Sequence, residues 1–226
     1  MSNHIPNILS VDFDYFQNPS LSTFKKYPVG IDLPPDMSNA FWRETLREHS
    51  KDIAAVPFDR KEFSLLISIL TSLPSDISVQ VAFSHVEAYC FARRIAERWH
   101  SSCVNLVNVD MHHDIINEND SLDCGNWIGK LLEEKKVGKF NWVAKPLSKE
   151  MYGLTDEEFV SMKGHIGLET LADHSFDAVF ICRSNPWVPP AFDEYFSKLV
   201  GCCEKHFNSN SLKMELEVAQ KRNLAA

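Results

Sequence analysis

Short apolar runs alternate with amphipathic stretches along this chain of 226 residues. Apolar residues spaced three and four apart, among them Ala88, Ala92 and Ile95, predict a helix over 86–99, and the apolar run over 104–109 predicts the strand after it. By the same reasoning we expect strands over 8–14, 77–84, 140–144 and 178–182, and helices over 39–51, 127–135, 156–163 and 191–202. Strands that alternate with helices are typical of a parallel sheet covered by helices. We therefore predict an α/β fold with three layers, α/β/α, around a mainly parallel sheet.

The composition does not divide the chain, so we predict a single domain over 1–226. Region 17–58 is rich in proline and starts at the carboxyl end of an expected strand, where ligands bind in open α/β sheets. One interpretation is a lid or wall of a substrate site; the other is a surface excursion that packs only its own Phe41 and Trp42. Residues 204–226 are expected to form a polar C-terminal tail.

Charge and cysteine content narrow the classes of function. A net charge of −8 without a clustered Lys/Arg face argues against a nucleic-acid binder and favours a cationic partner. Six cysteines lack the spacing of a disulfide framework or a zinc finger, which favours reduced thiols. The N-terminus lacks an apolar signal segment, and no stretch is long enough to span a bilayer. We therefore predict a cytoplasmic protein with no membrane partner.

Two acidic motifs at the ends of expected strands carry the candidate chemistry. The run DMHHD at 110–114 follows one strand, and SVDFD at 10–14 closes another. In an extended segment, Asp110, His112 and Asp114 would point to one side. Oxygen and imidazole ligands together suit Mn²⁺ better than structural zinc, and two neighbouring cations need bridging carboxylates. Each run alone could be a solvated turn, but the pair favours a binuclear metal site.

These motifs resemble those of the ureohydrolase superfamily, the arginases and agmatinases, which hold two manganese ions with Asp-x-His-x-Asp, Ser-x-Asp-x-Asp and an earlier histidine. His85 would be that histidine. In ordinary arginases the Ser-x-Asp-x-Asp motif lies far downstream and the chain is longer. Both departures resemble the peptide arginases, which convert arginine residues of ribosomally made precursor peptides into ornithine. The runs NVDMHHD at 108–114, DCGNW at 123–127 and ICRS at 181–184 are also similar to that group.

The resemblance implies an arginase/deacetylase-like fold with a permuted strand order and a binuclear C–N hydrolase that acts on linear amidines. The products would be ornithine and urea, the cofactor two Mn²⁺ ions per chain, and the partner an arginine-containing precursor peptide in ribosomal peptide (RiPP) biosynthesis. Asp114 would also pass a proton to the leaving amine. The implied ligands are Asp12 and Asp110 as bridges, His85 and Asp114 on one ion, and His112 and Asp14 on the other.

Arginases carry a proton-shuttling histidine where this chain has Ile128. His113 is a candidate substitute, with a core imidazole as the alternative. Glu87 and Asp123 are candidates for binding the guanidinium, whose fork matches a carboxylate, and Asn126 is a third substrate-binding candidate. Glu87 could equally stabilise the start of a helix.

Two other functions remain open. A small-molecule ureohydrolase would act on free arginine, agmatine or a related guanidino compound. It would need groups that read the α-amino and α-carboxylate charges, for which Asn117 and Ser121 are only generic polar residues. A non-catalytic metal-binding interaction module would not need six ligands. Arg183 would repel a guanidinium, so we expect it to pair with an acid or a peptide carbonyl.

Overall fold

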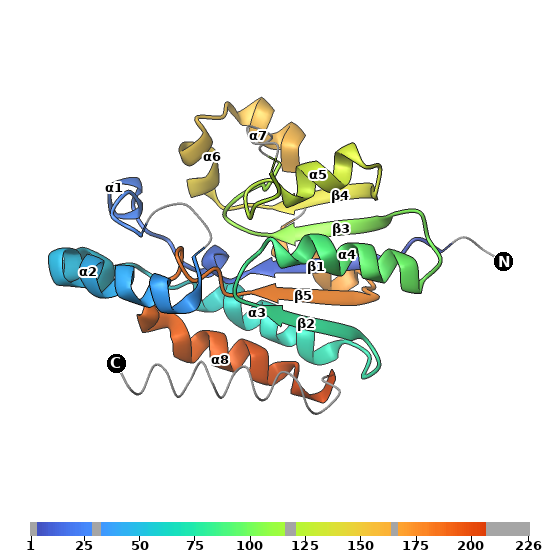
Figure 1. Cartoon of the computed structure of the whole chain (residues 1–226), viewed down its shortest axis with the longest axis horizontal. Helices are drawn as coiled ribbons and strands as arrows, with labels where there is room; N and C mark the ends of the chain where they lie inside the picture. Colours follow the sequence, from blue (N-terminus) through green and yellow to red (C-terminus); the bar gives the residue numbers. More distant parts are fainter. Residues whose placement is uncertain (1–3, 29–32, 116–120, 164–166, 207–226) are drawn as a thin grey trace.

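A sheet of five parallel strands forms the centre of the computed structural model, which describes residues 4–28, 33–115, 121–163 and 167–206 (Figure 1). Every neighbouring pair of strands is parallel, and the order across the sheet is β2-β5-β1-β3-β4. This confirms the predicted α/β class with a parallel sheet. The strands are β1 (Asn7–Asp12), β2 (Ser78–Ala82), β3 (Val104–Val109), β4 (Val137–Val143) and β5 (Ala178–Cys182).

Helices connect the strands and cover both faces of the sheet. The α-helices are α1 (Leu21–Phe24), α2 (Pro35–Ala54), α3 (Arg60–Ser72), α4 (Glu87–Arg98), α5 (Trp127–Glu133), α6 (Pro146–Tyr152), α7 (Asp156–Lys163) and α8 (Asp193–Cys202). Four 3-10 segments lie at Phe13–Phe16, Leu168–Asp173, Pro190–Phe192 and Glu204–His206. In the part of the chain that the structure describes, no helix has the length and apolar character that crossing a bilayer requires.

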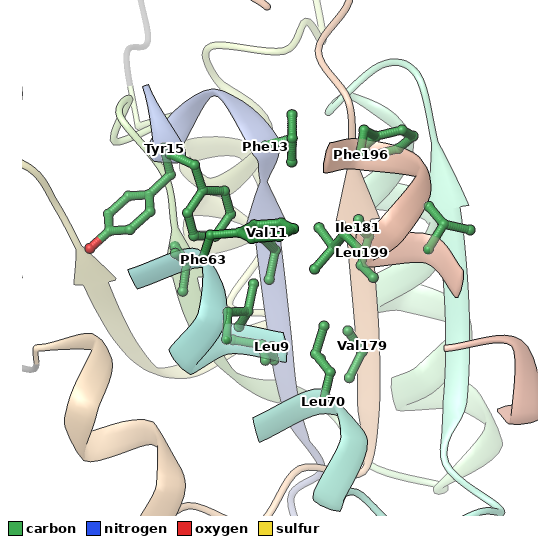
Figure 2. Close-up of a cluster of buried hydrophobic side chains, with 14 of the residues drawn as sticks. Leu9, Val11, Phe13, Tyr15, Phe63, Leu70, Val179, Ile181, Phe196 and Leu199 are labelled. Carbon is green, nitrogen blue, oxygen red and sulfur yellow. The ribbon is translucent and has the colours of Figure 1, made fainter. Parts of the chain in front are cut away.

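The first face of the sheet packs against α3 and α8. Leu9 and Val11 of β1 belong to one buried cluster with Phe63 and Leu70 of α3 and Leu199 of α8 (Figure 2). Because side chains alternate along a strand, these odd-numbered residues of β1 all reach the same face. Each fully buried aliphatic or aromatic side chain contributes about 1.5–3 kcal/mol to stability, so this cluster anchors β1 in the centre of the sheet.

The second face packs against α4 and α5. Ile8 of β1 and Phe180 of β5 lie in a second buried cluster with Phe91 of α4 and Trp127 of α5. Helices therefore lie on both sides of the sheet, as three layers require. The apolar spacing that predicted a helix over 86–99 corresponds to α4, whose apolar residues face the sheet.

The carboxyl ends of β1 and β3 form a position where ligands bind in open α/β sheets. These strands are neighbours, yet the chain after β1 leads to α3 on the first face, and the chain after β3 leads to α5 on the second. In open α/β sheets, ligands bind outside the strand ends where the connections diverge in this way. The strand arrows point toward α1 and α2, so most of region 17–58 lies at this end of the sheet (Figure 1).

Two predictions about backbone shape at this end are wrong. The strand predicted over 8–14 stops at Asp12, because the Asp12 side chain accepts the Asp14 N–H and begins a 3-10 helix. The motif after β3 is not extended either. Asp110 Oδ1 accepts the His112 N–H at 2.7 Å, and Asp114 adopts a left-handed φ of 53°. The ligands of each motif therefore converge through turns rather than through strand alternation.

Candidate metal centre

Three carboxyl groups surround the imidazole of His85. Its Nδ1 lies 3.2 Å from Asp12 Oδ2, 3.1 Å from Asp110 Oδ2 and 3.0 Å from Asp114 Oδ2. His85 follows β2, and its ring stacks on Phe180 of β5 at 5.9 Å, so it reaches over the end of β5 toward the ends of β1 and β3. We call these four ligand candidates the His85 group.

A second group forms around His112. Its Nδ1 lies 2.9 Å from Asp14 Oδ2 and 3.6 Å from Asp110 Oδ1. Asp110 thus presents Oδ2 to His85 and Oδ1 to His112. We call Asp14, Asp110 and His112 the His112 group. Asp12 uses its two oxygen atoms differently from Asp110. Its Oδ1 accepts the Asp14 N–H at 3.2 Å, and its Oδ2 faces His85. All six predicted ligands lie in these two groups, and Asp110 joins them.

The donor atoms fit divalent cations. His85 Nδ1, Asp14 Oδ2 and His112 Nε2 are buried and have no hydrogen-bond partner in the described part of the chain. Leaving such an atom unsatisfied costs about 1–3 kcal/mol. Four carboxyl groups are also buried together, and buried charges need a partner of opposite sign. Two divalent cations would satisfy the orphaned atoms and match the charge of the carboxylates.

The pKa shifts also indicate that these buried carboxyl groups require positive charge nearby. Burial lowers the pKa of His85, but the carboxyl groups of Asp110, Asp114 and Asp12 outweigh it and raise that pKa well above its ordinary value. Burial and then the Asp110 charge raise the pKa of Asp114 to about 7. Burial alone would raise the pKa of Asp110, yet the neighbouring imidazoles of His112 and His85 hold it well below the usual range. Asp110, the shared residue, is therefore held in its ionised form.

Neighbouring polar side chains orient His85 and Asp110. Ser10 Oγ lies 2.8 Å from His85 Nε2, which leaves Nδ1 facing the carboxyl groups. Asn108 Nδ2 donates to Asp110 Oδ2 at 3.0 Å. Hydrogen bonds of this kind fix the orientation and proton position of metal-binding residues. Ser10 and Asn108 belong to the two sequence motifs but were not predicted to have a role. A polar residue two positions before an acidic one at a strand end is the signal that could have identified them.

Two partners from distant segments hold the remaining carboxyl groups of the His85 group. Trp127 Nε1, at the start of α5, donates to Asp114 Oδ2 at 2.7 Å. The hydroxyl of Ser184, after β5, donates to Asp12 Oδ2. Ser184 has a left-handed φ of 50°, as Asp114 does at 53°, and such strained backbone concentrates at functional sites.

The start of α5 also fixes the backbone of Asp114. The Asp114 carbonyl accepts the N–H of Ile128 at 3.1 Å and of Gly129 at 3.2 Å. A Cβ on Gly129 would lie 2.9 Å from the Ile115 carbonyl oxygen, so a glycine permits this close approach. Ile128, which stands where arginases carry a histidine, is fully buried in the second apolar cluster.

His113 lies outside both ligand groups. Its ring stacks on Tyr152 at 4.2 Å and meets Trp142 edge-on at 5.6 Å. Its Nδ1 accepts the Ile115 N–H at 3.1 Å. Burial, followed by the charge of His112, lowers the pKa of His113 to about 4. This environment keeps the imidazole neutral and engaged in packing.

Two charged candidates form contacts elsewhere. Glu87 is exposed in the first turn of α4 and accepts a hydrogen bond from Gln80 at 3.4 Å. Arg183 donates through Nε to Asp193 Oδ1 at 3.0 Å and through Nη2 to the Val188 carbonyl at 3.3 Å. Arg183 thus pairs with an acid and a peptide carbonyl, as expected, and Glu87 is not part of either ligand group.

Asp123 and Asn126 organise the turn before α5. Asn126 Oδ1 accepts the Asp123 N–H at 2.9 Å, and its Nδ2 donates to the Ser121 carbonyl at 2.8 Å. Asp123 Oδ1 accepts the Gly125 N–H at 2.9 Å. Neither residue is brought into the ligand groups; both position the Trp127 end of α5. Asn117 lies outside the described residues.

Region 17–58 contacts the centre on the side of His112. The ring of Phe24, at the end of α1, lies 6.0 Å from that of His112. Trp42 of α2 is buried, and its Nε1 donates to the Asn185 carbonyl at 2.7 Å. The region therefore does more than pack its own aromatic residues, because it holds the loop after β5 and borders a candidate ligand.

Comparison of the chain with protein-family models, with curated proteins and with solved structures finds no match. The metal centre and the sequence motifs therefore carry the proposal of function.

Proposed function

We propose that this protein is a manganese-dependent hydrolase that converts arginine residues of a precursor peptide into ornithine and releases urea. The observation that carries the proposal is the convergence of four carboxyl groups and two imidazoles around a shared Asp110 at the carboxyl ends of β1 and β3. Sequence motifs separated along the chain supply these ligands together with their hydrogen-bond partners, which is typical of catalytic metal centres.

Asp12, His85, Asp110 and Asp114 would hold one ion, and Asp14, Asp110 and His112 the other. When bound, two divalent cations supply Lewis acidity, which activates water at neutral pH. Oxygen and imidazole donors suit Mn²⁺, which is the metal we propose.

The residues of the chain would orient the reactants and move one proton. Water adds to the guanidinium carbon, and the bond from that carbon to the ornithine nitrogen breaks. Asp114 would take one proton from the attacking water and pass it to the leaving amine. The second proton of that water would leave the protonated urea for the amine, so that urea and an ornithine ammonium group form.

A peptide substrate fits the surroundings of His112. In the described part of the chain, the rings that border His112 belong to Phe24 and Trp187. A free amino acid would require charged partners for its α-ammonium and α-carboxylate groups, whereas an arginine inside a peptide has neither charge. The net charge of −8 would also attract a cationic peptide.

The test is the mass change of peptides incubated with the manganese-loaded protein. A peptide with an internal arginine should lose one CN₂H₂ unit per converted residue and release an equal amount of urea. Free arginine, tested in parallel, should have a lower kcat/KM. Metal-free protein serves as the control and should release no urea.

Two outcomes would contradict this proposal. A clear preference for free arginine or agmatine would favour a small-molecule ureohydrolase. Two bound ions with no urea from any guanidino compound would favour a non-catalytic metal-binding module.

A further inference from the structure

Two partly exposed aromatic rings lie together beside His112. Trp187, in the loop after β5, has its ring centroid 4.8 Å from that of His112, and Phe24 of α1 stacks on Trp187 at 5.7 Å with an angle of 14° between the planes. Both side chains are only partly buried. The rings come from segments far apart in the sequence, so the fold brings a pair of parallel aromatic faces to one ligand of the centre.

Trp187 is held in place through its backbone. Its N–H donates to the Ser184 carbonyl at 2.8 Å, and its carbonyl accepts a hydrogen bond from Gln17 Nε2 at 2.6 Å. The amide oxygen of Gln17 in turn accepts the Tyr27 hydroxyl at 2.9 Å. Ser184 also donates to Asp12, so the loop that carries the ring is tied to the metal ligands. A ring positioned before the ligand arrives adds affinity because little ordering remains to be done.

Glu87 and Asp123, the carboxylates predicted to bind the guanidinium, form local hydrogen bonds instead. Glu87 accepts a hydrogen bond from Gln80, and Asp123 accepts one within the turn before α5. The four carboxyl groups of the centre face the two imidazoles. A planar, weakly hydrated guanidinium has another mode of recognition, which is stacking on an aromatic face.

We propose that Phe24 and Trp187 form the surface that receives the guanidinium group of the substrate arginine beside the metal centre. The identity of the substrate rests on the proposed function; the cation-binding role rests on the rings. Their faces carry negative partial charge, which attracts a delocalised cation, and the contact strengthens as water is excluded. These residues would then determine specificity for a cationic side chain.

The test compares a peptide containing one arginine with the same peptide containing citrulline, which has a similar planar shape without the charge. Binding is measured by calorimetric titration of the full chain. Both peptides are titrated into the metal-free protein, so that the arginine peptide is not consumed. The inert citrulline peptide is also titrated into the manganese-loaded protein. Trp187→Leu and Phe24→Leu remove a ring each, and Trp187→Phe keeps one. Phe41→Leu, on an exposed part of α2, is the matched control.

We expect Trp187→Leu to weaken binding of the arginine peptide by about twofold to thirtyfold, the range for cation–π contacts. Trp187→Phe should recover part of that loss, and the citrulline peptide should change little. Under turnover with manganese, Trp187→Leu should raise KM more than it lowers kcat. An equal loss for both peptides, or no loss for either, would overturn the inference.

The outcomes also separate this inference from the proposed function. Urea release by the wild type with unchanged binding in both Leu variants would remove the aromatic surface and leave the hydrolase. Charge-selective binding that depends on Trp187, without urea release by the manganese-loaded wild type, would keep the guanidinium surface and remove the hydrolase.

Discussion

The two halves of the candidate metal centre differ in how they are enclosed. In the His85 group the histidine side chain is only 2% exposed, and Ser10 holds its second nitrogen. In the His112 group the histidine side chain is 16% exposed and lies beside the partly exposed rings of Phe24 and Trp187. The His85 ring packs against Trp127 and Phe180 of the second apolar cluster, and we call this the sealed half. The His112 half faces region 17–58.

Under the proposed function, this difference gives the two halves separate tasks. Enclosed ligands that outer hydrogen-bond partners hold in place favour firm metal binding, whereas a catalytic metal site keeps an approach for water or substrate. Asp114 and Trp127 lie in the sealed half, and their hydrogen bond restrains Asp114, the group that we propose moves the proton. The substrate would approach past His112. Substitutions in the two halves should therefore affect metal affinity and substrate binding to different degrees.

The largest effect is expected at Asp110, which both halves share. Asp110→Asn removes the charge that lies between the two groups, so both ions should bind poorly. Turnover should fall by more than about 100-fold, which exceeds the roughly 10–100-fold loss typical of removing a residue that only hydrogen-bonds a metal ligand. Metal analysis after reconstitution with Mn²⁺, together with urea release, measures both. Asp156→Asn, whose wild-type side chain is 90% exposed, is the control. Retention of two ions and near wild-type turnover by a folded Asp110→Asn protein would contradict the shared role.

A smaller effect should follow in the sealed half alone. Trp127→Phe keeps an aromatic ring beside His85 but removes the N–H that donates to Asp114. Loss of such a partner costs about 10–100-fold in metal affinity. Titration with a competing chelator should show one weakened ion and one unchanged ion per chain. Trp99→Phe, at the exposed end of α4, should leave both unchanged. Equal weakening of the two ions by Trp127→Phe would show that the halves are not independent.

The sequence predicted the parts of the fold that depend on continuous apolar patterns. Strands β3 and β5 and helix α7 have the predicted bounds, because each is a single run of one periodicity between clear breaks. Helix α3 was not predicted, although Phe63, Leu66 and Leu70 have helical spacing and Asp59 caps its start by accepting the Glu62 N–H at 3.0 Å. That signal was present and was obscured by the proline-rich segment before it.

The ligands of the centre could be predicted from motifs, but their orientation could not. Asp12 and Asp114 depend on hydrogen bonds and on a left-handed φ that periodicity does not encode. The Ser184 hydroxyl reaches Asp12 across 172 positions of sequence. Trp187 meets His112 because β5 and β3, the strands that precede them, lie on either side of β1 in the folded sheet. Contacts of this kind arise from the order of strands, which the sequence motifs do not specify.

The smallest effect on turnover is expected at His113, the candidate substitute for the shuttle histidine. Its Nδ1 accepts the Ile115 N–H, and its ring is stacked on Tyr152 outside both ligand groups, so His113→Gln should lower kcat by less than about tenfold. Loss of a true general acid or base costs about 10²–10⁴-fold. The measurement is kcat against pH for the wild type and the variant, with thermal unfolding to separate lost packing from lost chemistry. A loss above 100-fold that added imidazole restores would instead make His113 the proton carrier, and would place proton transfer outside the sealed half.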